Sequence, residues 1–205
     1  TITSELDDIL KGLPSVNLEQ SDEFTMDGDT KPHEPSSEQE KSSKNTESPV
    51  VKNDPNRDKL ILSIYKLAST DYRLNGLFNE LKTLGKKYIN VKAASLRVLL
   101  DLAVCNYIQS ESLEADMKKE YKCNLRDIVL AKRLSYIQKN KLSSKTKIIV
   151  TKLMDDTSKY SLSILNGYVH GQNTCYLHHD FINSFFDFLF PLFSELLDIK
   201  EEKTK

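Results

Sequence analysis

The clearest candidate for chemistry is a set of polar or small residues on one side of the predicted helix 157–170. At about 100° per residue these positions fall within a stripe about 80° wide, and apolar residues occupy the opposite side. A histidine ends the stripe, and its side chain is the one that most readily exchanges a proton near neutral pH. The stripe consists of Lys159, Ser163, Asn166, Gly167 and His170. We expect Lys159 and Ser163 to be available for contacts with nucleic acid.

The position of His170 within its helix admits two interpretations. Gly171 follows it directly, and glycine is the usual residue where a helix ends in a left-handed conformation. The partial negative charge at a helix C-terminus favours the protonated imidazole. A charged imidazole there could meet a phosphate, or it could cap the helix and do nothing else. The pattern taken by itself favours capping.

A second candidate lies in the predicted helix 90–109, where Arg97 and Asp101 interrupt an otherwise apolar sequence. The helix has apolar side chains on nearly all of its sides, which is typical of a helix at the centre of a domain. The spacing i, i+4 places the two charges on one face, where they can pair. A buried arginine requires such a partner. A pair that satisfies itself is the favoured interpretation, ahead of a catalytic role for Arg97.

The charge is divided unevenly along the chain. Residues 1–55 contain 5 Lys or Arg against 13 Asp or Glu, whereas residues 56–205 contain 24 against 17. The basic part favours negatively charged partners such as RNA or DNA. Lys145 and Lys147 belong to a lysine-rich run that could form a phosphate-attracting face. Solvated helix surface is the commoner explanation of such a run.

Other classes of chemistry have little support. Cys175, His178 and His179 lie close together, but a structural zinc site needs four well-spaced ligands, so we predict no metal and no cofactor. No phosphate-binding glycine loop, nucleophile elbow or paired catalytic carboxylate motif occurs. The three cysteines are odd in number and widely spaced. This spacing favours reduced thiols in a cytoplasm. No signal peptide occurs, so we expect a cytoplasmic protein with no membrane partner.

The elements that must position these residues are all predicted to be helices. Apolar residues recur at intervals of three and four from residue 54 onward, and no period-2 run of β-branched residues stands out. The sequence therefore predicts an all-α helical bundle. The predicted helices span residues 57–68, 70–84, 90–109, 113–119, 124–138, 143–155, 157–170 and 177–199.

The chain divides into four predicted parts. Residues 1–14 form a short amphipathic helix, which is either the tail of an upstream domain or a peptide that docks in a groove. Residues 15–55 are an acidic linker, too poor in apolar residues to offset the entropy of ordering. Residues 56–200 are the helical domain, and residues 201–205 are a disordered tail. Because Thr1 is not methionine, we expect a piece of a longer protein.

The last predicted helix is unusually rich in phenylalanine. Polar residues interrupt it, so it is not a transmembrane span, and Pro191 is expected to kink it. Core packing accounts for Phe181, Phe185 and Phe188 at i, i+4, i+7. The surplus aromatic surface suggests a subunit interface, so we expect a homodimer. The candidate interface residues are Phe186, Phe190 and Phe193.

Two stretches carry a resemblance to a known family. They are NELKTLGKKYINVKAASLRVLLDLAVCNYIQ at 79–109 and LNGYVHG at 165–171, followed by the long final helix. In their order and spacing they resemble HEPN-like helical domains, in particular the C-terminal domain that follows ParB/sulfiredoxin-like nuclease domains in prokaryotic multidomain proteins. The resemblance covers about 130 residues of the chain. The Arg97 and Asp101 pair is similar to the arginine-plus-acid pair of many such domains.

The resemblance implies a bundle that tends to dimerise and, in active members, a metal-independent ribonuclease with the pattern RNxxxH. His170 matches the histidine and Asn166 the polar position, but Leu165 stands where the arginine should be. A histidine would move protons and a guanidinium would stabilise charge on the phosphate. Leucine supplies no charge. An active site would therefore need Arg97, Arg73, Arg126 or a residue from a second subunit to reach the same place.

Two functional expectations follow from the resemblance. The first is a non-catalytic module that dimerises, positions or regulates an upstream nuclease-like effector domain and contacts nucleic acid, in phage defence or DNA processing. The second is a toxin-like, metal-independent endoribonuclease that uses His170 with an arginine from outside the motif. The missing motif arginine places the first ahead of the second.

Overall fold

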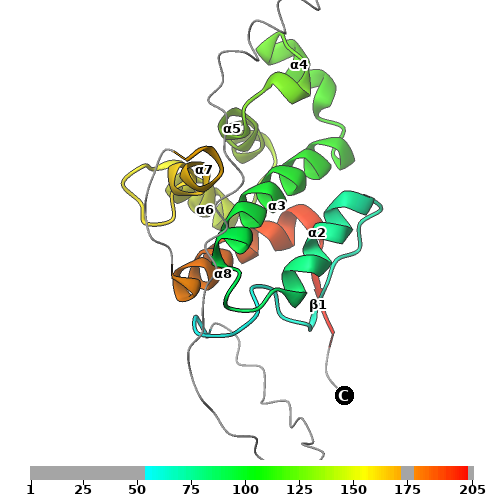
Figure 1. Ribbon diagram of the computed structural model, residues 1–205. Coiled ribbons are helices and arrows are strands. Elements are labelled where there is room, and N and C mark those ends of the chain that lie inside the picture. The colour runs from blue at the N-terminus through cyan, green and yellow to red at the C-terminus, as the bar shows by residue number, and fades with distance from the viewer. Residues whose placement is uncertain (1–53, 172–177, 203–205) are drawn as a thin grey trace, which may run out of the picture. The chain divides into compact units, whose positions relative to one another are not determined.

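The computed structural model describes residues 54–171 and 178–202, and within them it confirms an all-α bundle (Figure 1). The predicted helix at 1–14 and nearly all of the predicted linker lie outside the described residues. The α-helices are α2 (Tyr72–Thr83), α3 (Ile89–Ser110), α4 (Glu114–Tyr121), α5 (Leu130–Asn140), α6 (Ser144–Met154), α7 (Leu162–His170) and α8 (His179–Leu197). The short elements are a 3-10 turn η1 (Leu125–Asp127) and strands β1 (Tyr65–Lys66) and β2 (Lys200–Glu201).

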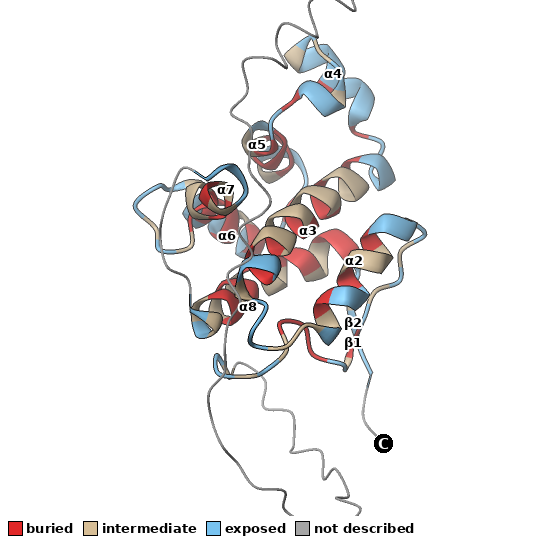
Figure 2. Cartoon of the chain, in the orientation of Figure 1, coloured by how far each residue is buried: buried red, intermediate tan, exposed pale blue. Residues whose placement is uncertain are grey.

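Helix α3 is the centre of the bundle, as its apolar residues predict. It packs against α2, α5, α7 and α8, and Figure 1 shows it running between them. Leu96, Leu99, Leu100 and Val104 are completely buried. Figure 2 shows the buried segments of α3 and α8 facing each other across the core. Side chains carried by α3 are therefore held in a fixed place relative to α5 and α7.

Helix α8 contributes its phenylalanines to this core, so the predicted dimer surface is wrong. Phe186 and Phe193 are 1% and 0% exposed, and their rings stack on each other. Phe190 packs against the ring of Tyr65, with 4.3 Å between the ring centroids. Because other elements cover α8 on several sides, its buried phenylalanines are not confined to one stripe of the helix. The helix also continues through Pro191 from His179 to Leu197.

The segment before β1 is not the helix predicted at 57–68. Arg57 holds it in an irregular path instead: its guanidinium makes two hydrogen bonds to the Asp187 carboxylate on α8, at 2.7 and 2.8 Å. The same guanidinium donates to the carbonyl oxygen of Leu60 at 3.0 Å. These bonds satisfy backbone groups that a helix would otherwise satisfy internally. Leu60 and Ile61 are completely buried, which explains the apolar spacing.

Two further buried polar side chains fix this segment. The Asn183 amide nitrogen donates to the carbonyl oxygens of Pro55 and Arg57, both at 2.8 Å. Lys92, at the start of α3, donates through its Nζ to the carbonyl oxygen of Asp58 at 2.6 Å. Asn183 and Lys92 are both completely buried. The N-terminal edge of the domain is thus held by specific hydrogen bonds to α3 and α8.

Two residues after α8 pair with the same edge. Strand β2 runs antiparallel to β1, with Tyr65 opposite Glu201 and Lys66 opposite Lys200. Lys82 on α2 donates to the carbonyl oxygen of Tyr65 at 2.7 Å. The predicted disordered tail at 201–205 is wrong at its start, because Glu201 belongs to a strand and the Glu202 N–H donates to the carbonyl oxygen of Ile64 at 2.8 Å. Residues 203–205 lie outside the described residues.

The predicted helix 124–138 is divided into two elements. The turn η1 ends at Asp127, and the backbones of Ile128 and Val129 are extended before α5 begins at Leu130. Lys122, which ends α4, has a left-handed backbone with φ 53°. These non-helical residues turn the chain between α4 and α5. Among the described helices, none has the length and apolar character needed to cross a bilayer.

Candidate functional site

Helix α7 begins later than predicted, and this changes its polar stripe. Its first residue is Leu162, so Lys159 lies in the preceding turn and is not on the helix. Ser163 is on the helix, but its hydroxyl lies 2.8 Å from that of Ser161, with which it shares a hydrogen bond. Gly171 ends the helix with φ 67°, which confirms the glycine as its terminator. The stripe on the helix itself reduces to residues 163–170.

Asn166 and Arg97 are brought together by the packing of α7 on α3. The Arg97 Nε donates to the Asn166 side-chain oxygen at 2.8 Å. Arg97 Nη1 lies 3.7 Å from Asp101, so the predicted i, i+4 pair is also present. The Arg97 side chain is only 15% exposed. This burial lowers the pKa of Arg97 below its usual value, while the neighbouring Asp101 opposes the change.

The same polar cluster continues from Asp101 to α5. Asp101 Oδ1 forms an ion pair with Arg133 Nη2 at 2.8 Å, without the geometry of a hydrogen bond. Arg133 Nε donates to the carbonyl oxygen of Ile128 at 2.9 Å, and its Nη1 donates to the Cys105 sulfur. The Arg133 side chain is 8% exposed. We call the set Asn166, Arg97, Asp101, Arg133 and Cys105 the α3 polar chain.

Sequence reasoning found only part of this cluster. It identified Arg97, Asp101 and Asn166 but not Arg133 or Cys105. The available signal was spacing, because Arg97, Asp101 and Cys105 follow one another at i, i+4 on α3. Arg133 occupies a core position of α5 and gives no such signal, because its partners come from another helix.

His170 lies one helical turn beyond Asn166 and is exposed at the end of α7. In the described part of the chain its side chain makes no hydrogen bond or ion pair. The imidazole is therefore open to solvent rather than packed in the interior. Leu165, at the position of the family's motif arginine, is completely buried. A side chain at that position faces the core. The arginine that contacts the motif's polar residue, Asn166, is Arg97 from α3.

The predicted nucleic-acid contacts lie around α6 and the turn before α7. Lys145 is exposed on α6, and Lys147 is half-buried there. Lys159 is exposed and its ammonium lies 4.7 Å from the centroid of the Tyr160 ring. Within the described residues these three lysines form no ion pair. Their charges are thus free to attract a phosphate, although Lys159 does so from the turn and not from the helical stripe.

The arrangement combines a largely buried guanidinium on α3, bound to Asn166, with an exposed imidazole one turn beyond Asn166 on α7. Both groups can donate hydrogen bonds to a phosphate oxygen. The described residues contain no group of three His, Cys, Asp or Glu side chains that could hold a metal ion. Comparisons with protein-family models, curated proteins and solved structures find no match to this chain. The resemblance to HEPN-like domains therefore stays a prediction from the residues.

Proposed function

We propose that this chain contains a HEPN-like, non-catalytic helical module that contacts nucleic-acid phosphates with the edge formed by α3 and α7. The hydrogen bond between Arg97 and Asn166 carries the proposal, because it holds the guanidinium against Asn166, which lies one helical turn before the exposed His170 on α7. The exposed lysines of α6 and the turn before α7 supply further positive charge. Electrostatic contacts of this kind bind the backbone of RNA or DNA irrespective of sequence.

Binding is favoured over cleavage by the surroundings of Arg97. Its Nε is occupied by Asn166, and the Asp101 carboxylate lies close enough to neutralise part of its charge. A guanidinium that stabilises a transition state needs to face the developing charge without such competition. Leu165 is buried and offers no replacement. We infer that the edge holds a phosphate without promoting its transfer.

The role of the module towards other parts of its protein is proposed from the resemblance. In this proposal the domain positions or regulates a nuclease-like effector domain joined to it, in phage defence or DNA processing. Homodimerisation belongs to the same proposal, but the face that would form the dimer is no longer the one predicted on α8.

The proposal is tested by the binding of a fluorescently labelled single-stranded RNA, followed by fluorescence anisotropy at low salt. His170→Ala is expected to weaken binding about three- to tenfold, because it removes one charge-assisted contact of a mostly electrostatic interface. Val169→Ala, an exposed change on the same turn, is the control and should leave the affinity unchanged. Equal affinities of the wild type and the His170 variant at all salt concentrations would contradict the proposal.

One observation favours a second candidate, the metal-independent endoribonuclease. An arginine from outside the motif does reach the motif's polar residue, because Arg97 contacts Asn166. The same RNA, examined for cleavage products after incubation with a chelator, separates the two functions. Products that vanish in the His170→Ala variant would support the ribonuclease, and intact RNA with wild-type binding would support the non-catalytic module.

A further inference from the structure

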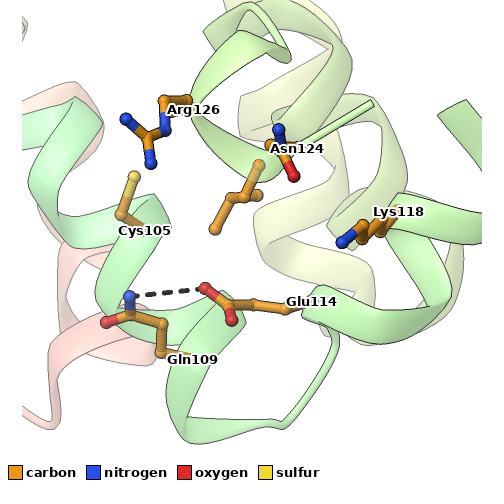
Figure 3. A pocket seen from close by; sticks show the side chains of 7 residues that line it. Cys105, Gln109, Glu114, Lys118, Asn124 and Arg126 are labelled. Atoms are coloured by element: carbon orange, nitrogen blue, oxygen red, sulfur yellow. Dashed lines mark hydrogen bonds between the residues drawn. The ribbon is translucent and has the colours of Figure 1, made fainter. Parts of the chain in front are cut away.

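A cleft of about 480 Å³ opens beside the far end of the α3 polar chain, between α3, α4 and η1. Its volume lies within the range of sites that hold small molecules. Figure 3 shows its side chains converging on one opening from three directions. The lining residues are Cys105, Gln109, Glu114, Lys118, Asn124, Leu125 and Arg126.

Two cations stand on different sides of this cleft. Arg126 comes from η1 and lies near Cys105, whereas Lys118 comes from α4 and points into the opening from the opposite side (Figure 3). Both side chains are exposed, and neither forms an ion pair or hydrogen bond within the described residues. Other arginines of the domain are paired, as Arg57 is with Asp187 and Arg133 with Asp101. An anion entering this cleft would meet two charges that have no partner yet.

Two amide side chains also line the cleft. Gln109 continues the i, i+4 series of α3 after Cys105, and Asn124 stands at the turn before η1. An amide offers a donor and an acceptor side by side, the pattern that reads the edge of a nucleobase. Glu114 also lines the cleft, where its carboxylate accepts a weak hydrogen bond from Gln109 at 3.4 Å. This carboxylate disfavours an anion next to Gln109 and Glu114, which leaves the space between Arg126 and Lys118 for the phosphate.

The floor of the cleft is less polar than its rim. Leu125 and Cys105 also line the cleft and are half-buried, whereas Lys118 and Arg126 are exposed. Burial raises the pKa of the Cys105 thiol, and the neighbouring Arg133 only partly opposes that change. The sulfur is therefore a neutral, polarisable surface on which a flat ring can rest. Thiolate chemistry is disfavoured here.

We propose that the cleft binds one nucleotide unit, with its phosphate between Arg126 and Lys118 and its base against Gln109, Asn124 and the Leu125 side chain. The unit is either a free mononucleotide or one residue of a strand that continues along α3. The polar chain points from this cleft towards Arg97, about 12 Å away along the helix axis at 1.5 Å per residue. The proposal is independent of the contact assigned to His170, because no residue is shared by the two sites.

The test uses isothermal titration calorimetry of the full chain with adenosine 5′-monophosphate, adenosine and inorganic phosphate as separate probes. The monophosphate is expected to bind more tightly than either fragment, because only it engages both the cations and the amides. The double variant Lys118→Ala with Arg126→Ala should weaken its binding about tenfold, which corresponds to the loss of two exposed charge-assisted contacts. The affinity of an oligoadenylate of six residues, compared with that of the monophosphate, distinguishes one residue of a strand from a free mononucleotide.

A matched control removes the same charge elsewhere. Lys119→Ala with Arg73→Ala changes two exposed cations that do not line the cleft, and the affinity for the monophosphate should stay at the wild-type value. Thermal unfolding checks that both double variants are folded. No binding of the monophosphate, equal losses in the two double variants, or phosphate binding as tightly as the monophosphate would each overturn the proposal. A loss in the cleft variant together with an unaffected His170→Ala variant would leave this proposal standing and remove the proposed function at α7.

Discussion

At the scale of single residues, the domain depends on a few buried polar side chains with demanding partners. Lys92 is completely buried at the start of α3, yet its ammonium donates only to the carbonyl oxygen of Asp58 among the described bonds. Burial lowers the pKa of Lys92 from 10.5 to about 8, while the Asp58 carboxylate partly opposes this change. The folded domain therefore binds the lysine proton less tightly than the unfolded chain does.

This pKa difference predicts how stability changes with pH. Between about pH 8 and 10.5 the unfolded chain carries more of the Lys92 proton than the folded domain, so the free energy of unfolding rises with pH in that window. We expect the wild type to gain on the order of 3 kcal/mol relative to Lys92→Met across it. Urea unfolding of both proteins at a series of pH values measures the gain. A constant difference between them would show that Lys92 is not titrating as expected.

At the scale of elements, a side chain on one helix can bind the N-terminus of another and join the two. Ser143 is the N-cap residue of α6, and Glu195 on α8 accepts hydrogen bonds from the Ser143 backbone N–H and hydroxyl, each at 2.7 Å. Thr146 donates to the same carboxylate at 2.7 Å. Burial alone would raise the pKa of Glu195, but the bonds from Thr146 and Ser143 outweigh it and the pKa is lowered. The carboxylate thus fastens the start of α6 to α8.

Glu195→Gln should lower the free energy of unfolding by about 1 to 3 kcal/mol at pH 7, because the bonds lose their charge assistance. The stabilisation by Glu195 is present above the pKa of the unfolded chain, about 4.5, and is lost as pH falls through the lower folded pKa. The variant and the wild type should therefore converge in stability in acid. Glu120→Gln, an exposed change on α4, is the control in the same urea titration. Similar losses in both variants would refute the capping role.

Elements also show which features the sequence predicted and which it did not. The helices α2, α3, α6 and α8 were found within about a turn, because each has apolar residues at helical spacing and α6 has its serine cap. The segment containing Arg57 has the same spacing but forms no helix, since its carbonyl groups are bound by its own Arg57 side chain and by Asn183 and Lys92 from other helices. Such long-range partners leave no trace in a local pattern. The late start of α7 is local in origin, because the Asp155 and Ser158 side chains accept hydrogen bonds from the backbone N–H groups of Thr157 and Tyr160 in the preceding turn.

In the candidate site too, features within one helix were predictable and contacts between helices were not. The spacing of Arg97 and Asp101 on one helix face indicated their pair, and the glycine after His170 indicated the end of α7. The contact between Arg97 and Asn166 depends on how α7 lies on α3, which no single helix determines. Arg133 and the nucleotide cleft depend on the turn between α4 and α5. Residues that act across helices were therefore the ones that sequence reasoning missed.

At the scale of the whole molecule, we expect the buried aromatic side chains of α8 to decide stability and not assembly. Phe193→Ala should lower the free energy of unfolding by about 3 to 5 kcal/mol, because it removes a completely buried ring. Its particle mass by light scattering should equal that of the wild type. Tyr72→Ala, a change at a 91% exposed ring, is the control and should alter neither quantity. A variant with halved mass and unchanged stability would restore α8 as a dimer interface.

The α3 polar chain has a consequence for the two proposed sites that lie near its ends. Asn166, Arg97, Asp101, Arg133 and Cys105 each contact the next, so a phosphate that draws Arg97 away from Asp101 leaves that carboxylate to Arg133 alone. The electric field over the sulfur at the cleft then changes. Because a coupling free energy is reciprocal, whatever factor one ligand imposes on the affinity of the other is returned in equal measure. Binding at one site would then change the affinity of the other.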